Sequence, residues 1–149
     1  MAKGKSIGYA CVWHNGPSLE EQVARLRKFG CWNVYEETAE GRPHGRKLML
    51  ALLDVRPGDY FVVLRLSSIG HSYKRLAHVL RTLQEQEVDL RVLDEGLDTR
   101  GQHGELIIPK TLELISIFQS ANSEAILNGL AKARAKGRVE VAPQFQTVR

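Results

Sequence analysis

The sequence predicts an α/β fold in which helices flank a mostly parallel central sheet of about four strands. Three observations support this prediction. Segments with strand-like patterns alternate with segments of helical periodicity, as in successive βαβ units. The apolar run Tyr60–Leu66 has the length and composition of a buried central strand. Recognisable helix start and stop signals separate the strand-like segments, so the helices are connections between neighbouring parallel strands.

The first βαβ unit is predicted from the N-terminal segment. Lys5–Val12 is apolar and suited to a strand. Ser18 with Glu21 three residues later forms a capping-box pattern, and Gly30 is a typical helix stop, so a helix is expected between them. Its apolar positions recur at helical spacing and are Leu19, Val23, Leu26 and Phe29. Trp32–Glu36 then completes the unit as a second strand.

Further segments continue the alternation. A polar loop is expected over residues 37–45, followed by a helix from Arg46 to about Val55 and a turn at Arg56–Asp59. The strand Tyr60–Leu66 comes next, and after it a helix whose apolar positions are Tyr73, Leu76, Ala77, Leu80 and Leu83. The strand Val88–Leu93 and a polar loop at Asp94–Gly104 complete this part of the chain. The Pro-Gly pair within the turn has the composition that tight turns require. Crossovers of this kind are right-handed and give a largely parallel sheet.

A long helix is predicted from about Leu106 to Lys136. At ~1.5 Å per residue it would be about 45 Å long, more than a domain of this size is expected to cover. Its broad apolar stripe consists of Leu112, Leu114, Ile115, Phe118, Ala121 and Ala125. We interpret this stripe as an interface for self-association into a dimer or higher oligomer; the alternative is a kinked helix packed fully on its own domain. The predicted organisation is a core over 1–105, the helix of the same domain over 106–137, and a basic, irregular tail over 138–149.

The charge of the chain is concentrated near its C-terminus. The net charge is +4, and residues 130–149 carry five basic residues against one acidic residue, so the remainder is neutral overall. Lys132, Arg134, Lys136 and Arg138 are therefore candidate contacts for a DNA phosphate backbone. A solvated helix end is the alternative, because cations are favoured near helix C-termini.

Composition excludes several classes of protein. No apolar run approaches the roughly 20 residues needed to span a bilayer, so no membrane partner is expected. Cys11 and Cys31 are too few for a disulfide scaffold and favour a cytoplasmic protein. His14, His44 and His71 show no recognised metal-ligand spacing, so we expect neither a metal nor a cofactor.

Several motifs, in the same order and at similar spacing, resemble the catalytic domain of serine recombinases, the resolvases and DNA invertases. The segment Tyr9-Ala10-Cys11-Val12-Trp13 matches a family pattern that reads Tyr-Ala-Arg-Val-Ser. Arg56–Asp59, Glu95–Thr99 and Gly129–Gly137 match later segments. The similarity runs from about Lys5 to Arg138 and implies the three-layer resolvase-like fold.

The resemblance also implies which residues matter for function. In the family, the serine attacks a DNA phosphate and arginines stabilise the transition state, for which their planar, permanently charged fork is suited. In this sequence Trp13 stands at the nucleophile position and Cys11 at the neighbouring arginine position. Ser67, Ser68 and His71 replace an aspartate and two arginines, whereas Gln22, Arg46 and Glu124 are retained.

These departures predict a protein that has lost DNA cleavage. Cys11 could supply a new nucleophile if neighbouring cations lowered its pKa, but a buried cysteine more often serves as a small apolar residue. Trp13 is interpreted as a plug in the vacated site, with a partner surface as the alternative. No helix-turn-helix domain is expected in the residues after Arg138.

Three functions remain open at this point. The preferred hypothesis is a non-catalytic recombinase-like protein that assembles with itself, with DNA, and with an active recombinase or another DNA-bound protein. The second is a scaffold module without a role on DNA, and the third is a residually active recombinase.

Overall fold

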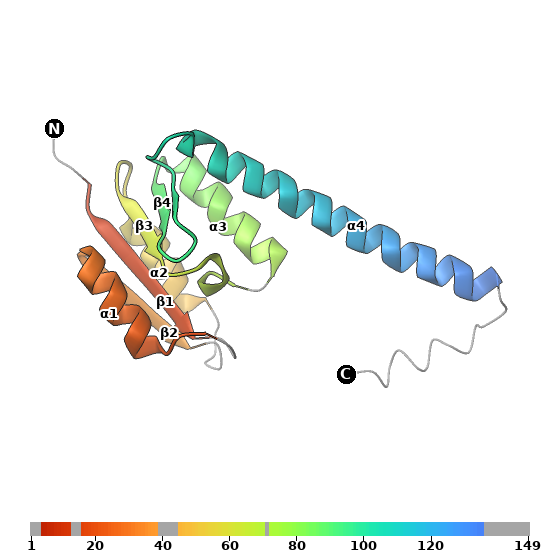
Figure 1. Cartoon of the computed structure of the whole chain (residues 1–149), viewed down its shortest axis with the longest axis horizontal. Helices are drawn as coiled ribbons and strands as arrows, with labels where there is room; N and C mark the ends of the chain where they lie inside the picture. The colour runs from red at the N-terminus through yellow and green to blue at the C-terminus, as the bar shows by residue number, and fades with distance from the viewer. Residues whose placement is uncertain (1–3, 13–15, 39–44, 71, 136–149) are drawn as a thin grey trace. The chain divides into compact units, whose positions relative to one another are not determined.

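A five-stranded sheet with the order β2-β1-β3-β4-β5 forms the centre of the fold (Figure 1). The computed structural model describes residues 4–12, 16–38, 45–70 and 72–135. Its strands are β1 Ser6–Val12, β2 Asn33–Thr38, β3 Tyr60–Val63, β4 Asp89–Val92 and β5 Leu97–Asp98. Two units are distinguished, Met1–Leu112 and Glu113–Arg149, and each is described by itself. The sheet belongs to the first unit.

The sheet is parallel except at one edge. β1 pairs in parallel with both β2 and β3, and β3 pairs in parallel with β4. The mostly parallel sheet predicted from the sequence is therefore confirmed. The fifth strand, β5, lies in the segment that was predicted as a loop, and it runs antiparallel to β4. The prediction of a loop was therefore wrong at β5, because a two-residue strand is too short to produce a periodic sequence pattern.

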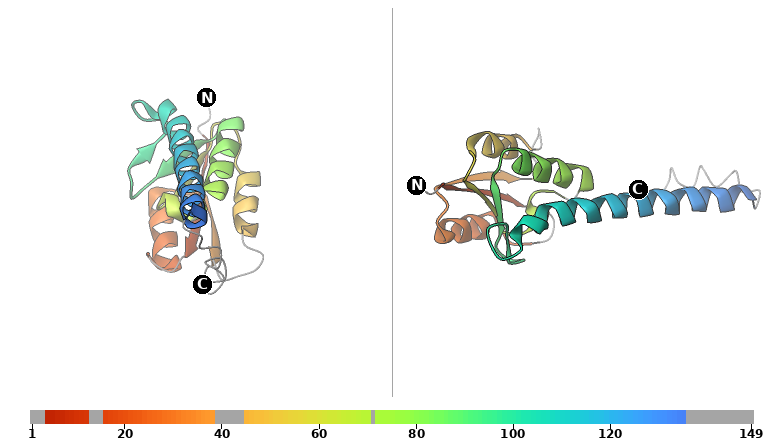
Figure 2. Two further views of the ribbon diagram at one scale, coloured as in Figure 1. Left: turned by 90° about the vertical axis from the view of Figure 1, so that its right-hand side faces the viewer. Right: turned by 90° about the horizontal axis from the view of Figure 1, so that it is seen from above.

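Helices cover both faces of the sheet. The three connecting helices are α1 Leu19–Phe29, α2 Arg46–Asp54 and α3 Tyr73–Glu85. α1 lies on one face, whereas α2 and α3 lie on the other (Figure 2). This arrangement follows from right-handed crossovers, because the chain moves outward from β1 to β2 and then returns across β1 to β3 and β4.

The predicted helix-capping signals act as expected. The side chain of Ser18 accepts a hydrogen bond from Glu21 N at 3.1 Å and begins α1. Gly30 ends the same helix with a φ of 117°, a conformation that glycine adopts without steric cost. Ser72 caps α3 in the same way, accepting from Arg75 N at 3.3 Å.

The core lies between the helices and the sheet. Its largest fully buried side chains include Tyr9, Phe61, Ile7, Leu26, Leu64, Ile69, Leu80, Leu83 and Leu90. Two predicted helix-face residues are more exposed than expected, Phe29 at 40% and Tyr73 at 41%. Each stands at the end of its helix, where the sheet no longer covers the apolar face. The Phe29 ring is instead covered by the guanidinium of Arg91, whose carbon lies 5.5 Å from the ring centroid.

The central strand ends earlier than the sequence pattern indicated. β3 stops at Val63, and the predicted continuation to Leu66 enters a short 3₁₀ helix, Leu66–Ser68. Polar groups after β4 hold this turn, since Leu66 N donates to Glu95 Oε1 at 2.7 Å. Asp94 accepts from Arg65 at 3.0 Å and from Arg25 at 2.7 Å. These side-chain contacts turn the chain away from the sheet despite its apolar sequence.

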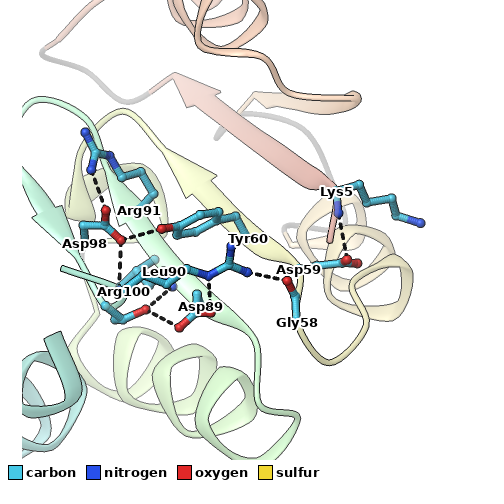
Figure 3. Close-up of polar contacts among 10 residues, drawn as sticks. Lys5, Gly58, Asp59, Tyr60, Asp89, Leu90, Arg91, Asp98 and Arg100 are labelled. Atoms are coloured by element: carbon cyan, nitrogen blue, oxygen red, sulfur yellow. Dashed lines mark hydrogen bonds and ion pairs between the residues drawn. The ribbon is translucent and has the colours of Figure 1, made fainter. Parts of the chain in front are cut away.

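A polar network joins β5 and the residues that follow it to β3 and β4 (Figure 3). Tyr60 Oη donates to Asp98 Oδ1 at 2.7 Å, and Arg91 donates to Asp98 Oδ2 at 2.8 Å. Arg100 donates to Asp89 Oδ2 at 2.6 Å, and its guanidinium lies 4.0 Å from the Tyr60 ring centroid. Burial, followed by the hydrogen bond to Asp98, raises the pKa of Tyr60 to about 12. The network anchors the segment between the sheet and the long helix.

The long helix α4 spans Ile107–Ala135 after a short 3₁₀ turn, Gly104–Leu106. The prediction of a helix from about residue 106 is confirmed over this range, and Lys136 lies outside the described residues. Exposed apolar side chains of α4 are Leu114, Ile117, Phe118, Leu127 and Leu130. Of the remaining residues in the predicted stripe, Leu112 is half-buried, Ile115 is buried, and Ala121 and Ala125 are exposed. Among the described residues, no helix has the length and apolar character needed to cross a bilayer.

Candidate functional site

The carboxyl end of β1 is the natural place for a site in this sheet. β1 has β2 on one side and β3 on the other, so the strand order reverses at this strand. In open α/β sheets, ligands bind beyond the carboxyl ends of the strands at such a reversal. Five residues gather there, and we call them the switch-point site: Tyr9, Cys11, Gln22, Glu37 and Arg75.

Cys11 is held as a buried thiol. Its side chain is 3% exposed, and its Sγ lies 3.9 Å from the carbonyl oxygen of Val12. Burial is the largest influence on its pKa and raises it; the hydrogen bond with Tyr9 and the charge of Arg75 oppose this, whereas Glu37 reinforces it. Because the net effect is upward, Cys11 is protonated at neutral pH and is a poor nucleophile.

Gln22, which the sequence analysis gave as a retained family residue, connects several parts of the site by hydrogen bonds. It is buried, and its Nε2 donates to the carbonyls of Cys11 at 3.0 Å and Pro17 at 3.1 Å. Ser68 is also buried, and its Oγ lies 3.5 Å from Gln22 Oε1. Ser67 is exposed. Gln22 therefore links α1, the end of β1 and the turn after β3 in one hydrogen-bonded group.

A chain of three polar side chains crosses the site. Tyr9 Oη donates to Glu37 Oε1 at 2.7 Å, and Arg75 NH2 donates to Tyr9 Oη at 3.5 Å. The second oxygen of Glu37 accepts from Lys47 N at 3.3 Å. Burial, followed by the hydrogen bond to Glu37, raises the pKa of Tyr9. The buried Tyr9 hydroxyl thus connects a carboxylate from β2 with a guanidinium from α3.

Arg75 was missed in the sequence analysis because its placement depends on space left by two glycines, the nearby Gly70 and the distant Gly45. A Cβ atom at Gly70 would lie 2.8 Å from Arg75 Cδ, and one at Gly45 would lie 3.3 Å from Arg75 NH2. The guanidinium therefore occupies space that these residues leave open. Glu37 and Tyr9 lie within segments whose sequence resembles the family, so this resemblance could have indicated them as site residues. Arg75 has no comparable signal in the sequence.

The remaining predicted site residues lie apart from this cluster or outside the described residues. Arg46 is exposed in the first turn of α2. In the second unit, Glu124 is exposed and borders a shallow groove with Ser116, Gln119, Ser120 and Ser123. Lys132 and Arg134 are exposed near the end of α4. The residues outside the described ranges are Trp13, His14, His44, His71, Lys136 and Arg138.

In the described part of the chain, no three His, Cys, Asp or Glu residues are grouped closely enough to hold a metal ion. The polar groups at the switch-point site are instead the buried phenol, amide and thiol of Tyr9, Gln22 and Cys11, with the half-buried carboxylate of Glu37 and guanidinium of Arg75. Hydrogen bonding and charge are therefore the chemistry that these residues offer.

Comparison with known sequences identifies the family. The profile described as "Resolvase, N terminal domain" matches residues 7–139. A "Probable DNA-invertase y4cG" of Sinorhizobium fredii is 30% identical over 138 residues, which cover 92% of this chain and 45% of that protein. "Serine recombinase gin" of Escherichia phage Mu is also 30% identical over 138 residues, covering 72% of its length. The chain thus spans less than half of the first relative and about three quarters of the second.

Solved structures agree on the fold. A resolvase family site-specific recombinase from Streptococcus pneumoniae superposes with a TM-score of 0.67 at 22% identity, covering 89% of this chain and 99% of that one. The N-terminal catalytic domain of TP901-1 integrase gives a TM-score of 0.61 at 19% identity, covering 81% and 98%. The profile match over most of the sequence and the similarity to these relatives show that the chain belongs to the resolvase N-terminal domain family of site-specific recombinases.

Proposed function

We propose that this chain is a recombinase-family protein that has lost DNA strand cleavage and acts by associating with itself and with DNA. The observation that carries this proposal is the identity of the residues at the family's catalytic positions. By the resemblance to the family's motifs, Trp13 stands at the nucleophile position, and Cys11, Ser68 and His71 stand at arginine positions. Indole carbon does not attack phosphorus, and none of the three replacements carries the permanent charge of an arginine.

The size of the expected loss supports the proposal. Removing a covalent nucleophile costs on the order of 10⁴–10⁶ in rate. A transition-state arginine contributes about 10³–10⁵ in phosphoryl transfer. These losses do not add simply, but any one of them would reduce cleavage to a negligible rate.

The environment of Cys11 argues against a replacement nucleophile. Its thiol is almost fully buried, and burial raises its pKa. The carbonyl of the same residue is occupied by Gln22. Catalytic cysteines instead lie in partly exposed, electropositive surroundings that favour the thiolate. We therefore assign Cys11 to the core rather than to chemistry.

Self-association is supported by the surface of α4. Leu114, Ile117 and Phe118 are each at least half exposed, and Leu127 is 64% exposed further along the helix. Apolar side chains exposed along one helix are a feature of protein interfaces. We propose that a second copy of the chain covers them, with an active relative as an alternative occupant of the same face.

Association with DNA is supported by the basic end of α4 and by the family. Lys132 and Arg134 are exposed on the last turns, and Lys136 and Arg138 follow in the sequence. The relatives are named as a DNA-invertase and a serine recombinase. Cationic side chains of this kind bind the phosphate backbone without reading sequence.

A scaffold function without DNA is the second candidate. It is favoured by residues 1–129, which carry no net charge, together with the exposed apolar side chains of α4. In this case the cations at the helix end would only complement the helix dipole.

One binding experiment separates these functions. Binding to a 30-base-pair duplex is measured over a range of salt for the full chain and for a variant with Lys132, Arg134, Lys136 and Arg138 changed to Gln. A matched variant changes four exposed cations of the first unit to Gln: Arg27, Lys28, Lys74 and Arg81. We expect the first variant to lower the slope of log K against log salt by about 3 to 4, and the second to change it little.

Two outcomes would contradict the proposal. Absence of binding at low salt, combined with self-association in sedimentation, would favour the scaffold function. A covalent protein–DNA adduct on a denaturing gel would show surviving chemistry, and its loss in Cys11→Ala would identify the nucleophile. An active family recombinase on its own site provides the positive control for the adduct.

A further inference from the structure

A cavity of about 290 Å³ lies on the first unit between the carboxyl ends of α2 and α3. Its walls come from the end of α2, the turn that follows it and the end of α3. The apolar part of the wall consists of Leu52, Leu53, Val55 and Pro57, and Glu85 and Glu87 also line the cavity. Because β3 and β4 begin directly after these segments, the cavity lies at the amino ends of the strands, opposite to the switch-point site.

Apolar surface continues from this cavity along α2. The side chain of Leu53 is 70% exposed, and that of Met49, one turn earlier, is 63% exposed. Residues four apart lie on the same face of a helix, so both side chains face the same partner. The cavity volume is just below the range of about 300–1,000 Å³ that is typical of small-molecule sites. The cavity and the apolar face therefore suit side chains of another protein rather than a separate small ligand.

The charges around the cavity favour a cation. Among the described residues that line it, Arg56 is basic and Glu85 and Glu87 are acidic. Neither glutamate forms an ion pair with another described residue. α2 and α3 both end here without a basic residue in the last turn, and each helix end carries roughly half a negative charge. A cationic partner group would complement both carboxylates and both helix ends.

Glu87 has a backbone conformation that glycine usually adopts. Its φ is 56°, in the left-handed region. Val88 N donates to Leu83 O at 2.9 Å and Glu87 N donates to Gln84 O at 3.2 Å, so Glu87 ends α3 at the position where glycine is preferred. Gly58 N donates to Glu87 O at 3.1 Å and joins this end of α3 to the turn before β3. A carboxylate is thus present at a steric cost, as is common for residues with a functional role.

We propose that this cavity docks a segment of a partner protein that presents a lysine or arginine flanked by apolar residues. The apolar residues of the partner contact Leu53 and Met49, and the cation pairs with Glu85 and Glu87. DNA does not fit this surface, because the carboxylates and the helix ends repel phosphates. The inference does not rest on the proposed function, since it involves neither α4 nor the basic end of the chain.

The test is an NMR titration of the ¹⁵N-labelled full chain with three acetylated and amidated tripeptides, Leu-Lys-Leu, Leu-Gln-Leu and Ser-Lys-Ser. We expect Leu-Lys-Leu to shift the amides of Leu53, Glu85 and Glu87, and the other two peptides to bind about fivefold more weakly. No shift at these amides up to about 5 mM Leu-Lys-Leu would overturn the site. Equal binding of Leu-Gln-Leu would overturn the role of the carboxylates, and equal binding of Ser-Lys-Ser would overturn that of the apolar face.

Variants of the chain test the same pairing from the other side. Changing both Glu85 and Glu87 to Gln should weaken Leu-Lys-Leu binding about fivefold. The matched control changes Glu20 and Glu105, two exposed glutamates elsewhere in the first unit, to Gln and should leave binding unchanged.

Glu87→Gly separates binding from folding. Glycine adopts the left-handed conformation without strain, so this variant should unfold at a higher urea concentration than the natural chain while it binds Leu-Lys-Leu more weakly. Loss of folding cannot then explain the weaker binding. Unchanged binding in both Glu87→Gly and the double glutamine variant would overturn the proposal.

Discussion

Asp98 is the centre of the network that attaches β5 to the sheet, and replacing it should destabilise the fold in a pH-dependent way. Its Oδ1 accepts from Tyr60 Oη at 2.7 Å and from Arg100 N at 3.0 Å, and its Oδ2 accepts from Arg91 at 2.8 Å. Asp98→Asn keeps one acceptor but turns an amide N–H toward Arg91. The change therefore removes one charged hydrogen bond and leaves the guanidinium uncompensated.

The magnitude follows from the type of bond and its exposure. Hydrogen bonds to charged groups contribute about 1.5–3 kcal/mol each. The side chains of Arg91 and Asp98 are 32% and 24% exposed, so solvent screening reduces this value. We expect a loss of about 2 kcal/mol in the free energy of unfolding at pH 7. With a urea m value of about 2 kcal/mol/M, the midpoint should fall by about 1 M.

The pH dependence gives a further test. Burial raises the pKa of Asp98, but hydrogen bonds from Tyr60, Arg100 and Arg91 outweigh it, so the pKa in the folded state is lowered. A lowered pKa means that the stabilisation is present above the unfolded value of about 4 and is lost as the pH falls through the folded value. The difference between the natural chain and Asp98→Asn should therefore shrink below about pH 4.

Urea unfolding followed by circular dichroism at a fixed protein concentration is the assay, because self-association would make stability depend on concentration. Glu105→Gln is the control, since Glu105 is exposed and the change removes the same charge. That variant should stay within about 0.5 kcal/mol of the natural chain. A difference for Asp98→Asn that is equally large at pH 7 and pH 3, or below 0.5 kcal/mol at pH 7, would refute the reasoning.

Three further predictions concern the site and the helix. Burial raises the pKa of Cys11, and it raises the pKa of Cys31 to about 11. A thiol reagent at pH 7 should therefore label both cysteines slowly until denaturant is added. Rapid labelling of Cys11 in the folded chain would contradict this prediction. Gln22→Leu removes hydrogen bonds to two carbonyls and should cost about 1–3 kcal/mol in urea unfolding, with an unchanged midpoint as the contrary result. The side chain of Leu114 is 52% exposed, so Leu114→Asp should not lower the unfolding midpoint. The same change should weaken self-association at least tenfold, as measured by sedimentation. An unaltered association constant would exclude Leu114 from the interface.

Local sequence signals account well for the helices. The prediction of α1 agrees with the structure at both ends, because Ser18 caps the first turn and Gly30 adopts the left-handed conformation that ends it. α3 likewise begins after the cap residue Ser72. These signals act over three or four residues, so they are readable without knowledge of the tertiary fold.

Strand ends and the edge strand were less predictable, because they depend on partners far along the chain. β3 ends before its apolar run does, where Leu66 N meets Glu95 and Arg65 meets Asp94. β5 exists because Arg91 and Val92 provide a pairing partner for Leu97 and Asp98. Neither feature leaves a periodic pattern in its own segment.

By itself, the sequence determined the fold class and the family, since both are written in the order and identity of residues along the chain. The replacement of the catalytic residues stays a prediction. Only the tertiary structure decided which side chains meet at the carboxyl end of β1. Arg75 reaches Tyr9 because Gly70 and Gly45 leave space for it, and Glu37 arrives from the neighbouring strand. Such a site depends on distances between residues that are up to 66 positions apart, and folding alone sets those distances.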